Sequence, residues 1–286
     1  MSARKFLVLP GIMVSVFLMT YNVQSSQHET SSDAGRSEPT AESMTIPTAE
    51  TVPLSANPAD TPPPALRGLL QPSEDTDLAP AYGPTLAKVH VIVFSDFQCG
   101  ACRRAADASR DIAAEFPGDV RLEFWQHPLN THGSAEDAAV ASLAAHRQGK
   151  FWDFHDELFR NQNALDEFSL LLYAHRVGLD EEQFQADYED AELRTRVREE
   201  AAFAGKMGAG KTPAFLINGK LHEGWGSWYG FRTLVERERN HIEELEAQGT
   251  SREKLVSKRV RENLADRAQW RRYRSLALDP LVKAAE

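Results

Sequence analysis

Cysteine is almost absent from this chain, because its 286 residues include only Cys99 and Cys102. Two cysteines cannot form the several bridges of a disulfide-rich domain, nor the four-thiolate cage of a structural zinc site. Zinc would need two more ligands, and His127 and His132 lie beyond the helix expected after the cysteines. A static structural disulfide is the other alternative. Two thiols separated by two residues, directly after an apolar run of β type, favour a dithiol that opens and closes as a disulfide.

Aromatic residues are missing between residues 24 and 80, a stretch rich in Ser, Thr, Pro, Glu and Asp. Such a segment buries too little apolar surface to offset the entropy lost when its backbone becomes ordered. We therefore expect residues 26–80 to be a disordered tether, with a pro-segment as the alternative.

A long apolar run is missing as well. The run from Phe6 to Met19, which follows Arg4 and Lys5, is shorter than the roughly 18–20 residues of a membrane-spanning helix. This pattern is typical of a secretory signal peptide over residues 1–25, and a retained membrane anchor is the alternative. Both interpretations export the protein to the cell envelope or periplasm, either secreted or anchored.

Basic residues are outnumbered, since 32 Lys and Arg stand against 42 Asp and Glu and the formal net charge is −10. This balance argues against nucleic acid as a partner, and the lack of a separate dimerisation domain predicts a monomer. Residues 243–286 are the exception, because basic residues outnumber acidic ones there in a helical pattern. We expect this basic helical C-terminal extension to be solvated and without a partner. Packing on the main domain, or contact with anionic lipid or an acidic partner, are the alternatives.

Strand and helix alternate around the cysteines. Residues 88–95 (KVHVIVFS) are β-branched and apolar on both faces, which predicts a strand in the middle of a sheet. The chain after Cys99 shows apolar residues at helical spacing as far as Pro117-Gly118, and residues 119–126 (DVRLEFWQ) predict a second strand. The strand, helix and strand form a βαβ unit, with Cys99 at the N-terminus of its helix.

Helical patterns then occupy about residues 134–207. Residues 212–220 predict a hairpin, because Asn218-Gly219 separates two apolar runs, and a final helix is expected from Trp228 to about Glu246. The chain is therefore expected to be α/β, with a βαβ unit, a ββα unit and an α-helical block inserted between them.

The position of Cys99 suggests its chemistry. A helix N-terminus presents unpaired N–H groups and the positive end of the helix dipole, which favour a thiolate. We expect Cys99 to be the attacking, partly exposed sulfur, and Cys102 to be more buried and to resolve the mixed disulfide. Asp96 could relay protons to or from Cys102, and capping the start of the helix is its alternative role.

Three motifs occur in order along the chain: GPTLAKVHVIVFSDFQCGAC, HPLNTHGSAEDAAVASLAAHRQGKFWDFHDELF and KTPAFLING. With them, the chain resembles the DsbA-like family of the thioredoxin superfamily over about residues 81–239. The resemblance implies a thioredoxin fold around a central mixed sheet for residues 81–242. It maps the catalytic pair onto Cys99 and Cys102, and the substrate-binding cis-proline loop onto Thr212 and Pro213. It implies no metal and no cofactor besides the redox-active disulfide.

The chain departs from this family between its cysteines. Gly100 and Ala101 stand where the family often has Pro and an aromatic residue or His. A His there can stabilise the thiolate of the first cysteine, so its absence predicts a weaker oxidant. Lys211, where the family usually has Gly, could place a positive charge near Cys99. A solvated loop lysine is the alternative, and we expect that one.

Residues and resemblance together predict an exported thiol–disulfide oxidoreductase that oxidises thiol-containing exported proteins. A membrane redox partner, which the sequence does not identify, would reset the pair. A disulfide reductase of the same fold is one alternative, and a tethered chaperone or peptide-binding module with incidental thiols is another. Trp225, Trp228 and Tyr229 are candidates for an apolar rim that holds unfolded substrate, with core packing as the alternative.

Overall fold

The computed structural model of the chain describes residues 72–264 and 266–285. The expected signal peptide or anchor over residues 1–25 lies outside the described residues, and so does the expected tether up to residue 71. Within the described part, no helix is both long enough and apolar enough to cross a membrane.

Residues 72–80, the last part of the expected tether, pack against the sheet. The amide of Ser73 donates to the carbonyl of Ala81 (2.8 Å), and the amide of Phe124 donates to the carbonyl of Pro80 (2.9 Å). Leu78 is buried. This segment therefore belongs to the folded domain, because its backbone and its one large apolar side chain both find partners there.

Five strands form one mixed sheet in the order β1-β3-β2-β4-β5. The central strand β2 (Val89–Ser95) is parallel to β3 (Val120–Gln126) and antiparallel to β4 (Ala214–Ile217). All seven residues of β2 are buried, as its continuous apolar sequence predicts. The edge strands are β1 (Ala81–Tyr82) and β5 (Lys220–Glu223). The expected α/β class with βαβ and ββα units is confirmed, and only the two-residue strand β1 was not expected.

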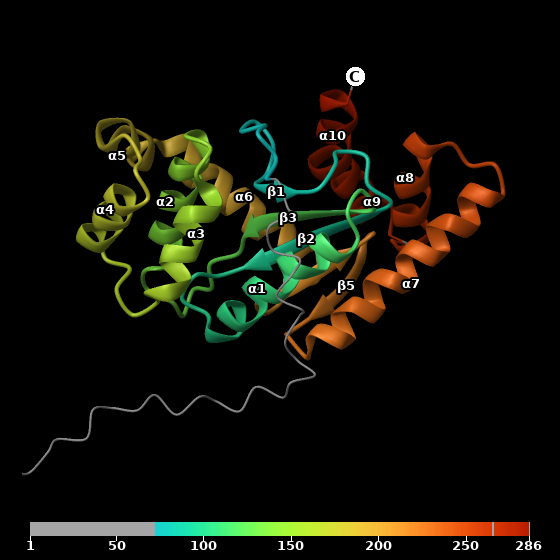
Figure 1. Ribbon diagram of the computed structural model, residues 1–286, viewed down its shortest axis with the longest axis horizontal. Helices are drawn as coiled ribbons and strands as arrows, with labels where there is room; N and C mark the ends of the chain where they lie inside the picture. The colour runs from blue at the N-terminus through green and yellow to red at the C-terminus, as the bar shows by residue number, and fades with distance from the viewer. Residues whose placement is uncertain (1–71, 265, 286) are drawn as a thin grey trace, which may run out of the picture. The chain divides into compact units, whose positions relative to one another are not determined.

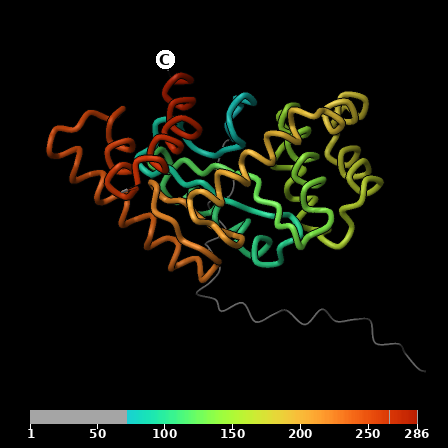
Figure 2. Tube along the Cα trace, turned by 180° about the vertical axis from the view of Figure 1, so that it is seen from behind, coloured from blue at the N-terminus to red at the C-terminus, as the bar shows by residue number. Residues whose placement is uncertain are grey.

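Helices cover both faces of the sheet. The side chains of Val89, Val91 and Val93 join the core under α1 (Gly100–Glu115) and α7 (Trp228–Ala247), which lie along one face (Figure 1). Ile92 and Phe94 point to the other face, which α6 (Ala191–Met207) crosses (Figure 2). The pleat of β2 thus sends alternate side chains into two separate cores.

The expected helical insertion is confirmed between β3 and β4. It consists of α2 (Ala135–Arg147), α3 (Phe151–Arg160), α4 (Glu167–Arg176), α5 (Glu181–Glu189) and α6. The core of α2–α5 includes Phe97 and Cys102, so the inserted helices pack against the end of the sheet that carries the cysteines.

The C-terminal helices pack on the domain, which corrects the expectation of a solvated extension without a partner. They are α8 (Arg252–Asn263), α9 (Arg267–Tyr273), a π-helical turn (Arg274–Leu278) and α10 (Asp279–Ala284). Val260 and Leu278 are buried in the core under the second face of the sheet. The hydroxyl of Tyr273 lies 2.9 Å from Nδ1 of His90 at the start of β2. A few apolar side chains among many basic ones are enough to attach these helices.

Candidate active site around Cys99 and Cys102

Cys99 occupies the first position of the helix that follows the central strand. Its backbone is extended (φ −76°, ψ 117°), and its carbonyl accepts from the amide of Arg103 (3.2 Å), so that it is the N-cap of α1. Cys99 is half-buried, whereas Cys102, one turn further on, is only 1% exposed. Both are free thiols. One sulfur of the pair is therefore open to a partner molecule, and the other is enclosed.

The surroundings of Cys99 favour its ionised form and lower its pKa from 9.0 to about 5. A hydrogen bond from the Cys102 thiol contributes most, and the amides of Cys102 and Ala101 add to it. Burial acts in the opposite direction. So does the carbonyl of Thr212, which lies 3.4 Å from the Cys99 sulfur and accepts a hydrogen bond from the protonated thiol. The donors outweigh both, and Cys99 is a thiolate at neutral pH.

Cys102 has the opposite preference. Burial, above all, and the hydrogen bond to Cys99 raise its pKa well above the usual range of a thiol. The amide of Asp96 lies 3.5 Å from its sulfur. The pair therefore shares one proton, which stays on the buried sulfur while the negative charge stays on the accessible one.

The loop before β4 faces the cysteines. The peptide bond between Thr212 and Pro213 is cis, and both residues are buried. Ala214 pairs with Phe94 near the end of β2, which brings the loop beside the start of α1. The Thr212 hydroxyl oxygen is buried and has no hydrogen-bond partner among the described residues. A backbone segment next to Cys99 is thus held by the sheet itself.

Asp96 organises the loop before Cys99 but does not cap α1, which corrects the capping interpretation. One carboxylate oxygen accepts from the amide of Gln98 (2.7 Å), a residue that precedes the helix. The other accepts from the amide of Leu129 (2.8 Å) and lies 2.8 Å from Nδ1 of His132. The contact of Asp96 with Cys102 is made through its backbone amide. Its carboxylate joins the loop of the first cysteine to the loop after β3.

The pKa of Cys99 is lowered without a nearby positive charge of the kind that a histidine between the cysteines would supply. Gly100, Ala101 and Lys211 have small parts in it. An added Cβ at Gly100 would meet nothing within 4 Å, so the position is open to a larger residue. Ala101 offers its amide to Cys99. Lys211 is exposed, and the groups that lower the pKa of Cys99 are hydrogen-bond donors rather than a lysine charge. These facts agree with a solvated Lys211.

Sequence reasoning missed Gln162, which lies in the loop between α3 and α4. Its side-chain amide donates to the carbonyls of Phe97 (2.6 Å) and Cys99 (3.1 Å). It therefore fixes the backbone on either side of Gln98, up to Cys99 itself. A single glutamine in a loop carries no periodic or motif signal, and only the tertiary structure shows this role.

Three aromatic residues follow β5, and each could either pack in the core or form an apolar rim for substrate. Trp228 is buried, and Trp225 packs on Phe215 and Phe231. Tyr229 is 58% exposed. Only Tyr229 of the three is therefore a clear candidate for contact with a partner molecule.

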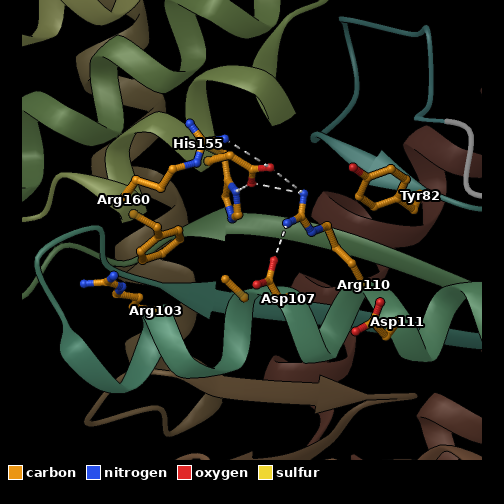
Figure 3. A pocket seen from close by; sticks show the side chains of 10 residues that line it. Tyr82, Arg103, Asp107, Arg110, Asp111, His155 and Arg160 are labelled. Atoms are coloured by element: carbon orange, nitrogen blue, oxygen red, sulfur yellow. Dashed lines mark hydrogen bonds and ion pairs between the residues drawn. The ribbon is translucent and has the colours of Figure 1, made fainter. Parts of the chain in front are cut away.

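A polar hollow of about 530 Å³ lies between α1 and α3 (Figure 3). Arg110 crosses it and pairs with Asp107 (2.6 Å) and Asp156 (3.0 Å). Tyr82 closes one end and Arg103 stands near the other. Neither cysteine lines this hollow, and most of its charges neutralise one another. Among the residues that the structure describes, no group of three or more His, Cys, Asp or Glu is placed to hold a metal ion.

The model of a protein family described as "Thioredoxin" matches residues 75–237. The chain belongs to the thioredoxin family. Its cysteine pair and its helical insertion agree with the resemblance that the sequence motifs indicated. A solved thioredoxin-like oxidoreductase from Silicibacter pomeroyi DSS-3 shares 33% of its residues, with a TM-score of 0.52 over 57% of this chain and 92% of the other.

Other solved structures share the fold of this thioredoxin-family protein. The thiol-disulfide exchange protein α-DsbA2 from Wolbachia pipientis is 21% identical, with a TM-score of 0.51 over 56% of this chain and 86% of the other. The catalytic domain of Proteus mirabilis ScsC is 18% identical, with a TM-score of 0.50 over 58% and 91%.

Curated relatives match about half of this chain at slightly higher identity. They include proteins named Na⁺/H⁺ antiporter NhaA from Herminiimonas arsenicoxydans (35% identical over 156 residues, 54% of this chain) and NhaA 1 from Salinispora arenicola (36% over 152 residues, 52%). The matches cover 25% and 23% of those proteins. This chain thus spans about a quarter of the length of the curated relatives it matches.

Proposed function

We propose that this thioredoxin-family protein is a dithiol oxidase for thiol-containing proteins outside the cytoplasm. The observation that supports the proposal most is the low pKa of Cys99, at about 5. A stable thiolate stabilises the reduced pair, and a more stable reduced form makes the disulfide a stronger oxidant. Hydrogen bonds from Cys102 and from backbone amides supply this stabilisation without a histidine between the cysteines.

In the oxidising direction, the thiolate of a client protein attacks the Cys99 sulfur of the Cys99–Cys102 disulfide. The bond between the two enzyme sulfurs breaks, a mixed disulfide forms at Cys99, and Cys102 leaves and takes up a proton. A second client thiolate then attacks the client sulfur of the mixed disulfide and releases Cys99 as a thiolate. Two electrons pass from the client to the enzyme, and the client gains one disulfide.

The client polypeptide lies along the Thr212-Pro213 loop in this proposal. The backbone there borders Cys99. The amide of Gly224 donates to the carbonyl of Pro213, and the exposed Tyr229 follows five residues later as an apolar contact. Asp96 acts as a positioning residue, because it ties the Cys99 loop to the loop of His132. The protein works as a monomer in the cell envelope, to which its N-terminal apolar segment directs it, and a membrane partner accepts its electrons.

Oxidative refolding tests this proposal. The oxidised protein is mixed with a reduced, unfolded protein that needs disulfides, and its reduced form is assayed separately for reduction of insulin. We expect rapid transfer of disulfides to the client and weak reduction of insulin. Cys99→Ala should abolish both reactions. Cys102→Ala cannot oxidise a client, but its Cys99 thiolate should attack a disulfide of insulin and accumulate as the mixed disulfide, because the resolving thiol is missing.

Two outcomes would favour the other functions. Fast insulin reduction with poor refolding indicates a reductase, which the missing histidine between the cysteines would favour. Protection of an unfolded client by both alanine variants, without redox turnover by the wild type, indicates a binding module instead.

A further inference from the structure

The C-terminal helices carry a charge opposite to that of the whole chain. Between Arg252 and Lys283 there are ten Lys or Arg and four Asp or Glu, a net charge of +6 in a chain whose net charge is −10. The family match ends at residue 237, so this charge belongs to a segment beyond the family domain.

Several of these cations are not neutralised. Arg259 is held by Glu238 (2.7 Å) and Arg274 by Asp279 (3.1 Å). For Arg252, Arg267 and Arg272, in contrast, no ion pair is found with any residue that the structure describes. The C-terminal helices therefore carry a net positive charge, and several of their arginines have no ion-pair partner among the described residues.

Apolar side chains are exposed on the same helices. Leu276 is 45% exposed and Val282 is 39% exposed. Val282 lies beside Arg252, whereas Leu276 lies beside Glu199 and Glu200. Tyr273 and Leu281 are buried and fix this segment on the domain. An exposed aliphatic side chain beside an unpaired arginine, such as Val282 beside Arg252, is typical of a face that lies in a lipid–water interface.

A crevice of about 40 Å³ opens at this surface, between residues 85–87 and helices α8 and α10. Val256, Leu281 and Val282 form its apolar wall, and Arg252 lines it as well. Arg121 also lines this crevice, together with Glu253, although its side chain and guanidinium are almost completely buried.

One nitrogen of this guanidinium lacks a partner. Nε of Arg121 donates to Glu123 (2.7 Å) and Nη1 to the carbonyl of Gly83 (3.3 Å), while Nη2 is buried without a hydrogen bond among the described residues. A buried donor without an acceptor is costly. An anionic oxygen would satisfy this donor, and the apolar wall of the crevice favours a ligand that is apolar elsewhere. A phospholipid, with an anionic phosphate and apolar acyl chains, fits this description better than a nucleic acid or an acidic protein.

We infer that the C-terminal helices bind the surface of an anionic phospholipid bilayer. This surface lies at the start of β2, where Tyr273 meets His90, whereas Cys99 follows the end of β2. A strand of seven residues at about 3.3 Å per residue separates the two ends by about 20 Å. The bound protein would thus hold its accessible sulfur away from the membrane and toward soluble clients.

A fluorophore on the proposed surface tests this orientation. The oxidised full-length protein, with Cys99 and Cys102 in their disulfide, carries a polarity-sensitive label at Val282→Cys or, as a control, at Tyr229→Cys near the other end. Vesicles of phosphatidylglycerol and phosphatidylcholine should shift the emission of the label at position 282 to the blue. Vesicles of phosphatidylcholine alone should not, and the label at position 229 should not respond to either.

Charge variants test the same contact by affinity. Replacing Arg267, Arg271 and Arg272 by Gln should weaken binding to the anionic vesicles, as read by the label at position 282, by about fivefold per cation and about a hundredfold in all. Replacing Arg103, Arg104 and Arg160 by Gln removes the same charge from the other end and should change binding by less than about threefold. The N-terminal segment is the same in all variants.

Three results would overturn the inference. The first is an unshifted label at position 282 in anionic vesicles. The second is an equal loss of affinity in the two triple variants, since this would reflect net charge alone. The third is an equal blue shift with soluble DNA, which would assign the surface to polyanions rather than to lipid.

Discussion

The hydrogen bond from the Cys102 thiol to Cys99 can be removed by Cys102→Ala. It is the largest of the contributions that lower the pKa of Cys99 to about 5. Hydrogen bonds to charged groups contribute about 1.5–3 kcal/mol, or about 1–2 pH units at about 1.4 kcal/mol per unit. Cys99 is half-exposed, so solvent screening reduces the expected rise to about 1 unit. The Cys102→Ala variant should therefore titrate near pH 6.

The assay is the ultraviolet absorbance of the thiolate, or the rate of alkylation of Cys99, followed as a function of pH. Cys102→Ser is the matched control, because its hydroxyl remains a donor, and its midpoint should stay within about half a unit of the wild type. A wild-type midpoint near the ordinary thiol value of about 8.5 would refute the reasoning. So would equal midpoints for the alanine and serine variants.

The same pKa makes the stability of the reduced protein depend on pH. The folded value is lower than the unfolded one, so the stabilisation is complete above the unfolded pKa and is lost as pH falls through about 5. Between about pH 5 and pH 8 the undiscounted gain is roughly 3.6 kcal/mol, and screening at this half-exposed site leaves about 2 kcal/mol. Urea unfolding of reduced and oxidised protein at both pH values measures it. A difference between the two forms that does not change with pH would contradict the account.

Three further substitutions probe the site and the fold. Ala101→His adds a cation beside Cys99 and should make the pair more oxidising by about 30 mV or more, as measured in glutathione buffers; an unchanged potential would contradict this. Asp96→Ala leaves the amides of Gln98 and Leu129 without their acceptor and should lower the free energy of unfolding by about 2–4 kcal/mol. Asp96→Asn keeps an acceptor oxygen and should lower it by less. Equal losses in the two variants would argue against these hydrogen bonds. Gly219→Ala places a residue with a side chain at φ +83°, and its Cβ would lie 2.9 Å from the side chain of Val260. Urea unfolding should show that the free energy of unfolding falls by about 2–3 kcal/mol. An unchanged midpoint would show that α8 does not pack there.

The framework of the fold could be predicted because its local patterns agree with its tertiary structure. The apolar run of β2, the Asn218-Gly219 turn and the helical periods of residues 134–207 each indicate one kind of element, and each element is present. The two cysteines were predictable for the same reason, because a helix N-terminus after a buried strand is a local feature.

The remaining features depend on contacts between distant parts of the chain. Gln162 reaches the carbonyl of Cys99, and Asp96 binds the loop of His132, through turns whose course no local pattern fixes. The C-terminal helices looked solvated because charge dominates their composition, although the few buried side chains, Tyr273 among them, decide where they pack. Such contacts follow from the tertiary structure and leave no local signal in the sequence.

The reduction potential of the Cys99–Cys102 pair tests the central claim most directly. It is measured by equilibrating the protein with glutathione redox buffers at neutral pH and quantifying the two thiols. A thiolate stabilised by hydrogen bonds alone predicts a value between those of DsbA, at about −120 mV, and thioredoxin, at about −270 mV. A value at or below that of thioredoxin would contradict the oxidase proposal and assign this protein to reduction.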